Sequence, residues 1–175
     1  SFRSLLASQI LLHNFLSDIP ATAIASDRVD EEWVKQPQRW NTVLIRDYML
    51  RFGLLSSMFD LLTFGALLYL FQSTPEEFRT GWFLESLLTE LVIALVVRTR
   101  RPFYRSRPGN WLLISTALVI VVALVLPYLP WSQVFGFVPL PAPLLLSMVG
   151  LTLAYVLAVE LAKKAFYSRA ASARP

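Results

Sequence analysis

Long apolar runs constrain this chain more than any other feature. Of its 175 residues, 55% are apolar and the mean hydropathy is +0.54, which is more apolar surface than one soluble core can bury. A helix needs roughly 20 mostly apolar residues to cross about 30 Å of hydrocarbon. The sequence therefore predicts an all-α membrane protein, a bundle of five transmembrane helices. The expected spans cover residues 4–25, 52–71, 82–97, 111–131 and 144–162.

The composition excludes several kinds of site. Cysteine is absent, so disulfides, thiolate nucleophiles and cysteine metal cages cannot form. His13 is the single histidine, which excludes sites that need two imidazoles. The net charge of +4 comes from basic residues beside apolar runs, so we expect a lipid bilayer as partner and no nucleic acid. The chain begins at Ser1 without a signal peptide, and we expect it to be cut from something longer.

The distribution of basic residues predicts the orientation of the bundle. Residues 98–107 carry five arginines, residues 163–174 add further Lys and Arg, and residues 28–51 are also rich in both. Residues 72–81 hold a single arginine, and residues 127–143 carry no charge. Short Lys- and Arg-rich connections face the cytoplasm. We therefore expect the basic loops and the C-terminus to be cytoplasmic, in a multi-pass protein of the plasma or inner membrane.

Four carboxylates fall within the expected spans as candidates, namely Asp18, Asp60, Glu85 and Glu90, while Glu160 lies near the end of the last span. An ionisable group at membrane depth costs a few kcal/mol or more, so each needs a partner or a function. For Asp60 and Glu85 we favour neutralisation by arginines that snorkel from helix ends. Glu90 lies deeper in its expected span, and there a ligand role and a structural role are equally open.

Asn14 and Asp18 are the strongest candidates for an ion site. They lie four residues apart, so on a helix they share one face, one turn apart. Pro20 cannot donate to the carbonyl of Leu16, which predicts a freed oxygen and a kinked or unwound helix there. Carboxylate, amide and carbonyl oxygens suit Mg²⁺ or Ca²⁺. The alternative is that Asn14 and Asp18 only hydrogen-bond to a neighbouring helix.

Two further features have plainer interpretations. His13 points away from the direction of Asn14 and Asp18, which favours a packing or hydrogen-bonding role. The arginines of residues 98–107 are more typical of a topology signal than of a binding site for anionic lipid head groups.

Residues 9–23, with the sequence QILLHNFLSDIPATA, resemble the sixth membrane helix of P-type cation pumps. That helix has an Asn, three residues, an Asp and then a Pro. The rest of the chain is most similar to the magnesium-transporting branch, as helices six to ten of a ten-helix pump. The matching segments are PQRW at 37–40, SSMFDLLTF at 56–64, GWFLE at 81–85 and RTRRPF at 98–103.

The resemblance implies roles for particular residues. Asn14 and Asp18 would be cation ligands, and Glu90 matches by position an acidic residue of calcium pumps. Mg²⁺ would be the transported ion and would also accompany ATP in the parent pump. Asp60 matches a Phe-Asp pattern of the magnesium pumps without an assigned role. The Ile-Pro pair after Asp18 is a calcium-pump trait, so the identity of the ion stays open at this point.

The implied activity is ATP-driven transport through an aspartyl-phosphate, but the phosphorylation motif and nucleotide domain are not in this sequence. The chain would then act with the N-terminal part of the same pump. It would supply part of the ion cage, brace the bundle and present residues 27–46 to the cytoplasmic domain. Two alternatives remain at this stage. One is a Ca²⁺ or proton pump fragment, and the other is a freestanding membrane assembly module without transport.

Overall fold

A computed structural model describes residues 5–27, 42–99 and 101–172 of the chain. Within these residues the protein is helical and contains no strand. The long helices are α1 (Ala7–Ala23), α3 (Thr42–Gly65), α4 (Pro75–Val97), α5 (Asn110–Val125) and α6 (Ala142–Ser172). The PQRW segment at 37–40 and most of the connection between the first two expected spans lie outside the described residues.

Short helical turns extend or connect the long helices. A 3-10 turn, η1 (Ile24–Ser26), follows α1, and wider π-helical turns, η2 (Ala66–Leu70), continue α3. The remaining turns are η3 (Phe103–Arg105), η4 (Leu126–Tyr128) and η5 (Ser132–Phe135). The helices α3, α4 and α6 are longer than the spans expected at 52–71, 82–97 and 144–162.

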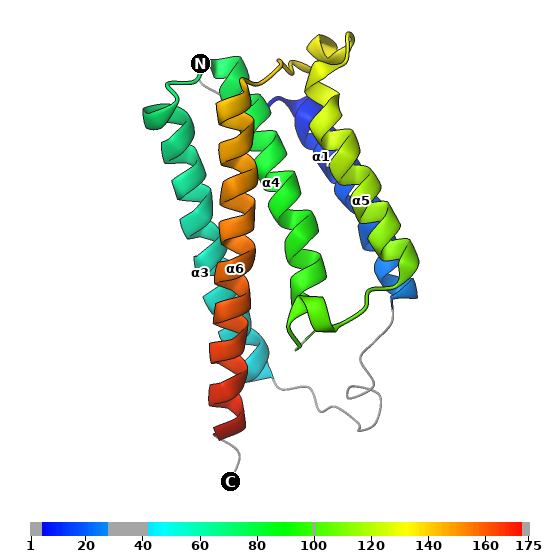
Figure 1. Cartoon of the computed structure of the whole chain (residues 1–175), viewed down its shortest axis with the longest axis vertical. Helices are drawn as coiled ribbons and strands as arrows, with labels where there is room; N and C mark the ends of the chain where they lie inside the picture. The colour runs from blue at the N-terminus through cyan, green and yellow to red at the C-terminus, as the bar shows by residue number, and fades with distance from the viewer. Residues whose placement is uncertain (1–4, 28–41, 100, 173–175) are drawn as a thin grey trace.

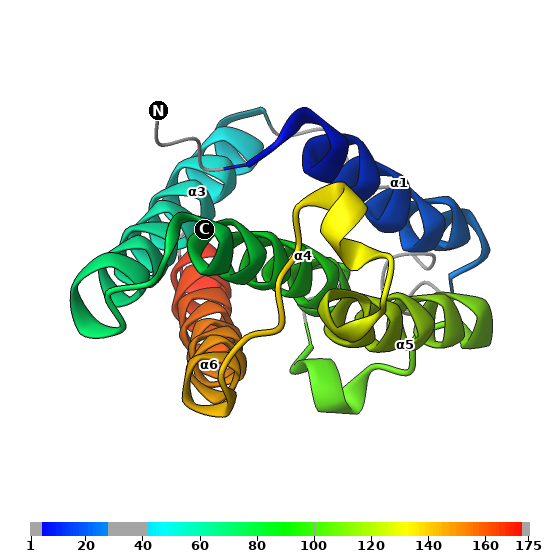
Figure 2. The ribbon, with the colours of Figure 1, turned by 90° about the horizontal axis from the view of Figure 1, so that it is seen from above.

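α4 is the central helix of the bundle. Seen from above, it lies between α1, α3, α5 and α6 (Figure 2), and it contacts all four. Half of its apolar stretch is buried (50%), against 17% for the stretch that includes α3. The apolar core accordingly forms around it, in one cluster centred on Phe83 and Leu87 and a second that includes Val96 and Tyr155.

Four of the described helical segments are long and apolar enough to cross a membrane: Ile45–Leu70, Pro75–Val97, Asn110–Tyr128 and Ala142–Tyr167. The predicted all-α class is confirmed for the described residues. The remaining predicted span, residues 4–25, forms the helix α1, but that helix has only 17 residues and is not among the four. At 1.5 Å per residue it covers about 26 Å.

The connections alternate between the two ends of the bundle. The end of α1, the start of α3, the α4–α5 connection and the end of α6 lie at one end (Figure 1). The η2–α4 and α5–α6 connections lie at the other end. The described basic connections therefore share one end, as the charge pattern predicts. That end is called the basic end below, and the other end is called the opposite end.

Candidate functional site

Asn14 and Asp18 lie on the face of α1 that points away from the other described helices. Both side chains are exposed, whereas Gln9, Leu16 and Pro20 of the same helix are buried. This division follows helical periodicity, since residues three, four and seven apart share a face. The exposed face also carries large apolar side chains, including Leu11 at 71% and Phe15 at 65% exposure. We call this face of α1, with Asn14 and Asp18, the outer stripe.

The backbone of α1 continues through Pro20, and the helix extends to Ala23 before the 3-10 turn. The predicted unwinding at Pro20 is therefore wrong. Proline removes the hydrogen bond to Leu16 alone, and the neighbouring hydrogen bonds of the helix can remain. Pro20 has no N–H, so the carbonyl of Leu16 receives no hydrogen bond from the backbone of residue 20.

Glu90 lies on α4 and does not join Asn14 and Asp18 within the described residues. Its carboxylate is 3.6 Å from Nδ1 of His13, and its side chain is 51% exposed. The His13 ring packs edge-on against Phe83, with 5.7 Å between ring centroids. His13 therefore fills the α1–α4 contact. No group of three or more Asp, Glu or His side chains among the described residues is placed to hold a metal ion.

Asp60 and Glu85 line a different polar region, a cavity of about 260 Å³ between α3, α4 and α6. Glu85 is 1% exposed. Neither of its carboxylate oxygens has a hydrogen-bond partner. Within the described residues no arginine pairs with Glu85, so its expected neutralisation by arginine is wrong there. Arg79, near the start of α4, pairs with Glu76, and Arg98, just after its end, pairs with Asp27.

A buried ion pair ties α1 to the α4–α5 connection at the basic end. Arg98 donates to Asp27 at 2.8 Å, and each side chain is only 10% exposed. The other Asp27 oxygen accepts from the backbone N–H of Gly109 at 2.6 Å. Arg98 also donates to the Ser106 hydroxyl at 3.0 Å. Sequence reasoning treated Asp27 and Arg98 as loop charges and missed this pair, because the two residues are 71 positions apart.

A buried lysine ties α6 to α4 at the same end. Lys163, 2% exposed, donates to the carbonyls of Val96 and Arg101, each at 2.9 Å. Its third hydrogen bond goes to the carboxylate of Glu160 at 2.8 Å. All three ammonium protons therefore have acceptors, and the positive charge sits where the C-terminal carbonyls of α4 gather.

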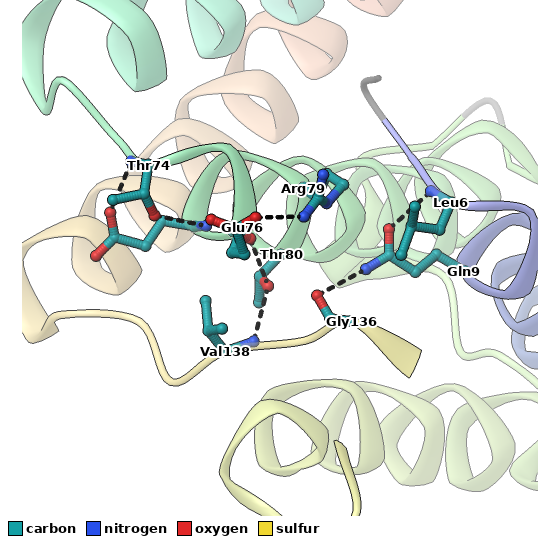
Figure 3. Close-up of polar contacts among 9 residues, drawn as sticks. Leu6, Gln9, Thr74, Glu76, Arg79, Thr80, Gly136 and Val138 are labelled. Atoms are coloured by element: carbon teal, nitrogen blue, oxygen red, sulfur yellow. Dashed lines mark hydrogen bonds and ion pairs between the residues drawn. The ribbon is translucent and has the colours of Figure 1, made fainter. Parts of the chain in front are cut away.

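At the opposite end, hydrogen bonds join the α5–α6 connection to α1 and α4 (Figure 3). Gln9 donates to the carbonyl of Gly136 at 3.3 Å, and the Thr80 hydroxyl accepts from the N–H of Val138 at 3.1 Å. Gly136 has a φ of +73°, and a Cβ there would lie 2.5 Å from the Leu6 side chain. Only glycine fits this turn without strain or displacement. The α5–α6 connection is thereby fastened to both α1 and α4.

The helix α4 begins with a capping box at this end. Thr74 accepts from the backbone N–H of Glu77 at 3.3 Å, and Glu77 accepts in return from the N–H of Thr74 at 2.9 Å. Pro75 occupies the first helical position, where no N–H is required. The pattern Thr-x-x-Glu was visible in the sequence and could have placed the start of α4 at Pro75 instead of residue 82.

Comparison with known proteins places these features in a family. Residues 2–165 match the family described as "Cation transporting ATPase, C-terminus". A magnesium-transporting ATPase, P-type 1, of Salmonella typhimurium is 38% identical over 173 residues, and its namesake in Escherichia coli is 36% identical. Each alignment covers 96% of this chain and 19% of the relative, so the chain spans about a fifth of these proteins. The chain therefore belongs to the family of C-terminal membrane regions of cation-transporting P-type ATPases.

Proposed function

We propose that this chain works as the C-terminal membrane bundle of an ATP-driven Mg²⁺ pump, in which the outer stripe supplies ligands to the transported ion. The observation that carries the proposal is the outer stripe itself, where Asn14 and Asp18 are presented together beside large exposed apolar side chains. Their oxygens are of the hard type that Mg²⁺ prefers. The relatives named above are magnesium transporters, which favours this ion over Ca²⁺ or protons.

The outer stripe is an incomplete site that the rest of the pump would complete. Carboxylate and amide groups at membrane depth are costly when they face lipid. Because the chain corresponds to 19% of its relatives, helices from the N-terminal part of the same pump would cover this face and add further ligands. Glu90 would contribute from α4 once those helices are in place. ATP hydrolysis and phosphorylation would belong to the N-terminal part.

We further propose that α1 crosses the membrane as a fifth span, with the basic end in the cytoplasm of a plasma- or inner-membrane protein. η1 lengthens α1 at the basic end, and the alternating connections support the arrangement. Because the chain lacks cysteine, single-cysteine variants can test the orientation. Arg107→Cys should react with an impermeant maleimide only from the cytoplasmic side, and Gln133→Cys only from the other side. The reverse labelling pattern would overturn the orientation.

The hydrogen bonds of α1 indicate which parts would move during transport. Asp27 joins one end of α1 to the α4–α5 connection, and Gln9 joins the other end to the α5–α6 connection. A ligand helix fastened at both ends is a poor candidate for large independent motion. We infer that helices from the N-terminal part move against α1, so that the ion site alternates between tight and weak states.

The test is ion-stimulated phosphorylation of the full-length pump that contains this chain. Asp18→Asn removes the negative ligand with almost no change in shape, and we expect Mg²⁺-stimulated phosphoenzyme formation to be lost while the protein still folds. Asp47→Asn is the matched control, because Asp47 is partly exposed and pairs only with its neighbour Arg46 at 3.3 Å. Normal phosphorylation in Asp18→Asn would reduce the outer stripe to a helix-packing surface.

A further inference from the structure

The cavity between α3, α4 and α6 is a second polar region, which shares Glu90 with the proposed ion site but contains neither Asn14 nor Asp18. It measures about 260 Å³, and its lining includes Asp60 from α3, Glu85 and Glu90 from α4, and Tyr155 from α6. One water molecule occupies about 30 Å³ of liquid, so this volume is ample for several waters. Neither the proposed transport function nor the family assignment gives Asp60 or Glu85 a role.

Glu85 is the unusual member of this lining. Its side chain is 1% exposed, and both carboxylate oxygens lack a hydrogen-bond partner. The hydroxyl of Thr63 on α3 is likewise buried without a partner. An ionised carboxylate in this position would cost several kcal/mol unless cavity water or a cation compensated for the lost hydration. A protonated Glu85 avoids that cost, because the carboxyl group is then neutral.

The surroundings of Glu85 do not suit a metal ion. The hydroxyls of Ser56 and Tyr155 are bonded to each other at 2.5 Å. Thr89 donates to the backbone carbonyl of Glu85 at 2.8 Å, and Ser86 donates to the carbonyl of Trp82 at 2.6 Å. Ser86 and Thr89 therefore donate their protons elsewhere than to the Glu85 carboxylate. Among the described residues, the carboxylates do not form a group of three that could hold a metal ion. A proton, unlike a metal ion, needs only one carboxylate oxygen and no set of converging ligands.

We propose that Glu85 is a proton-binding site that exchanges its proton with water through the cavity between α3, α4 and α6. In the loaded form an O–H bond exists on one Glu85 oxygen, and the carboxyl is neutral. In the unloaded form that proton has passed to cavity water or to the carboxylate of Asp60, and Glu85 carries the negative charge. The transfer requires no oxidant, reductant or other reactant.

The groups that line the cavity would make proton binding by Glu85 depend on the packing of α3 against α4. Asp60 faces the cavity from α3, Glu90 from α4 and the Tyr155 hydroxyl from α6. His13 of α1 approaches Glu90 but is not part of the cavity lining. No lysine or arginine is among the lining residues, so like charges surround Glu85 and favour its neutral form. Any movement of α3 against α4 would change the separation of Asp60 and Glu85.

Infrared spectroscopy of the full-length protein in lipid nanodiscs tests the proposal. We expect a carboxylic acid C=O band at neutral pH that shifts in D₂O and shifts again when glutamate is labelled with ¹³C at the side-chain carboxyl. Glu85→Gln should lose this band, equivalent to one carboxyl per chain. Glu76→Gln should keep it, because Glu76 is exposed and paired with Arg79. The isotope label assigns the band to a glutamate in the unaltered protein, and the nearly isosteric Glu85→Gln assigns it to Glu85.

Three results would overturn the proposal. The wild-type protein could show no glutamic acid band, only aspartate labelling could shift the band, or the band could fail to respond to D₂O. Asp18→Asn separates this site from the proposed transport function. That variant should lose ion-stimulated phosphorylation and keep the Glu85 band, whereas loss of the band in Asp18→Asn would join the two regions into one site and contradict their separation.

Discussion

The outer stripe and the α3–α4–α6 cavity contain similar residues in opposite settings. Asn14 and Asp18 are exposed on a helix at the edge of the bundle, whereas Glu85 is buried on the central helix α4. A carboxylate on the edge can gain partners from another part of the protein, but a sealed one has to be satisfied by what already surrounds it. On the proposals above, an intramembrane carboxylate at the edge of the bundle binds a metal ion together with ligands from other helices of the pump. A carboxylate buried within the bundle binds a proton instead.

The largest effect is expected from a change within the outer stripe. Asn14→Ala removes an amide oxygen from the proposed ion site, and we expect the Mg²⁺ concentration for half-maximal phosphorylation to rise by about 100-fold or more, since loss of even a supporting residue costs about 10–100-fold. Ser26→Ala is the control, because its hydroxyl donates only to the carbonyl of Ala23. If Asn14→Ala and Ser26→Ala reach half-maximal phosphorylation at the same Mg²⁺ concentration, Asn14 is not a ligand of the ion.

Breaking the ion pair at the basic end should weaken both stability and ion binding. Arg98→Ala leaves the carboxylate of Asp27 buried without its cation, which costs about 3–5 kcal/mol in comparable cases. Denaturation in detergent should reveal this loss, and ion affinity should fall too because the end of α1 is released. Asp47→Ala serves as the exposed comparison and should stay within about 0.5 kcal/mol. A stable Arg98→Ala protein would show that the pair contributes little.

The buried lysine offers a way to separate the two regions. Lys163→Met removes hydrogen bonds that join α6 to α4 and should cost about 1.5–3 kcal/mol, the range for hydrogen bonds to charged groups. Because α1 takes no part in these bonds, the Mg²⁺ dependence of phosphorylation should not change. Lys164→Met, at the exposed neighbouring position, should alter neither property. An altered ion affinity in Lys163→Met would mean that the outer stripe depends on the interior helices.

The smallest effect on stability is expected at the opposite end of the bundle. Thr80→Val keeps the side-chain shape but removes the acceptor for the N–H of Val138, and the lost bond should cost about 1–2 kcal/mol of unfolding free energy. Thr22→Val is matched to it, since the Thr22 hydroxyl is exposed and bonds only to the carbonyl of Ile19. If both variants melt alike, the link between α4 and the α5–α6 connection does not hold the bundle together.

Sequence reasoning succeeded where the signal is local. Apolar runs located the helices, and the spacing of Asn14 and Asp18 correctly placed both on one face of α1. The charge pattern correctly grouped the described basic connections at one end (Figure 1). Hydropathy and helical periodicity depend on residues close together in the sequence, so both can be used without knowing how the helices pack.

The failures concern contacts between distant parts of the chain. The pairing of Asp27 with Arg98 joins residues 71 positions apart, and nothing local to either one indicates it. The expectation of an arginine beside Glu85 failed because Arg79 pairs with Glu76 and Arg98 pairs with Asp27 at the two ends of α4. Whether a polar residue of a helix faces lipid, a cavity or a missing partner depends on how the helices pack, and the sequence leaves that packing undetermined.

The count of bound ions tests the central claim most directly. Mn²⁺, which resembles Mg²⁺ in its preference for oxygen ligands, can be titrated into the full-length pump in nanodiscs and counted by electron paramagnetic resonance. We expect Asp18→Asn to lose a tightly bound Mn²⁺ that Glu85→Gln retains. If Glu85→Gln loses the ion and Asp18→Asn keeps it, the cavity is the metal site and the outer stripe is not.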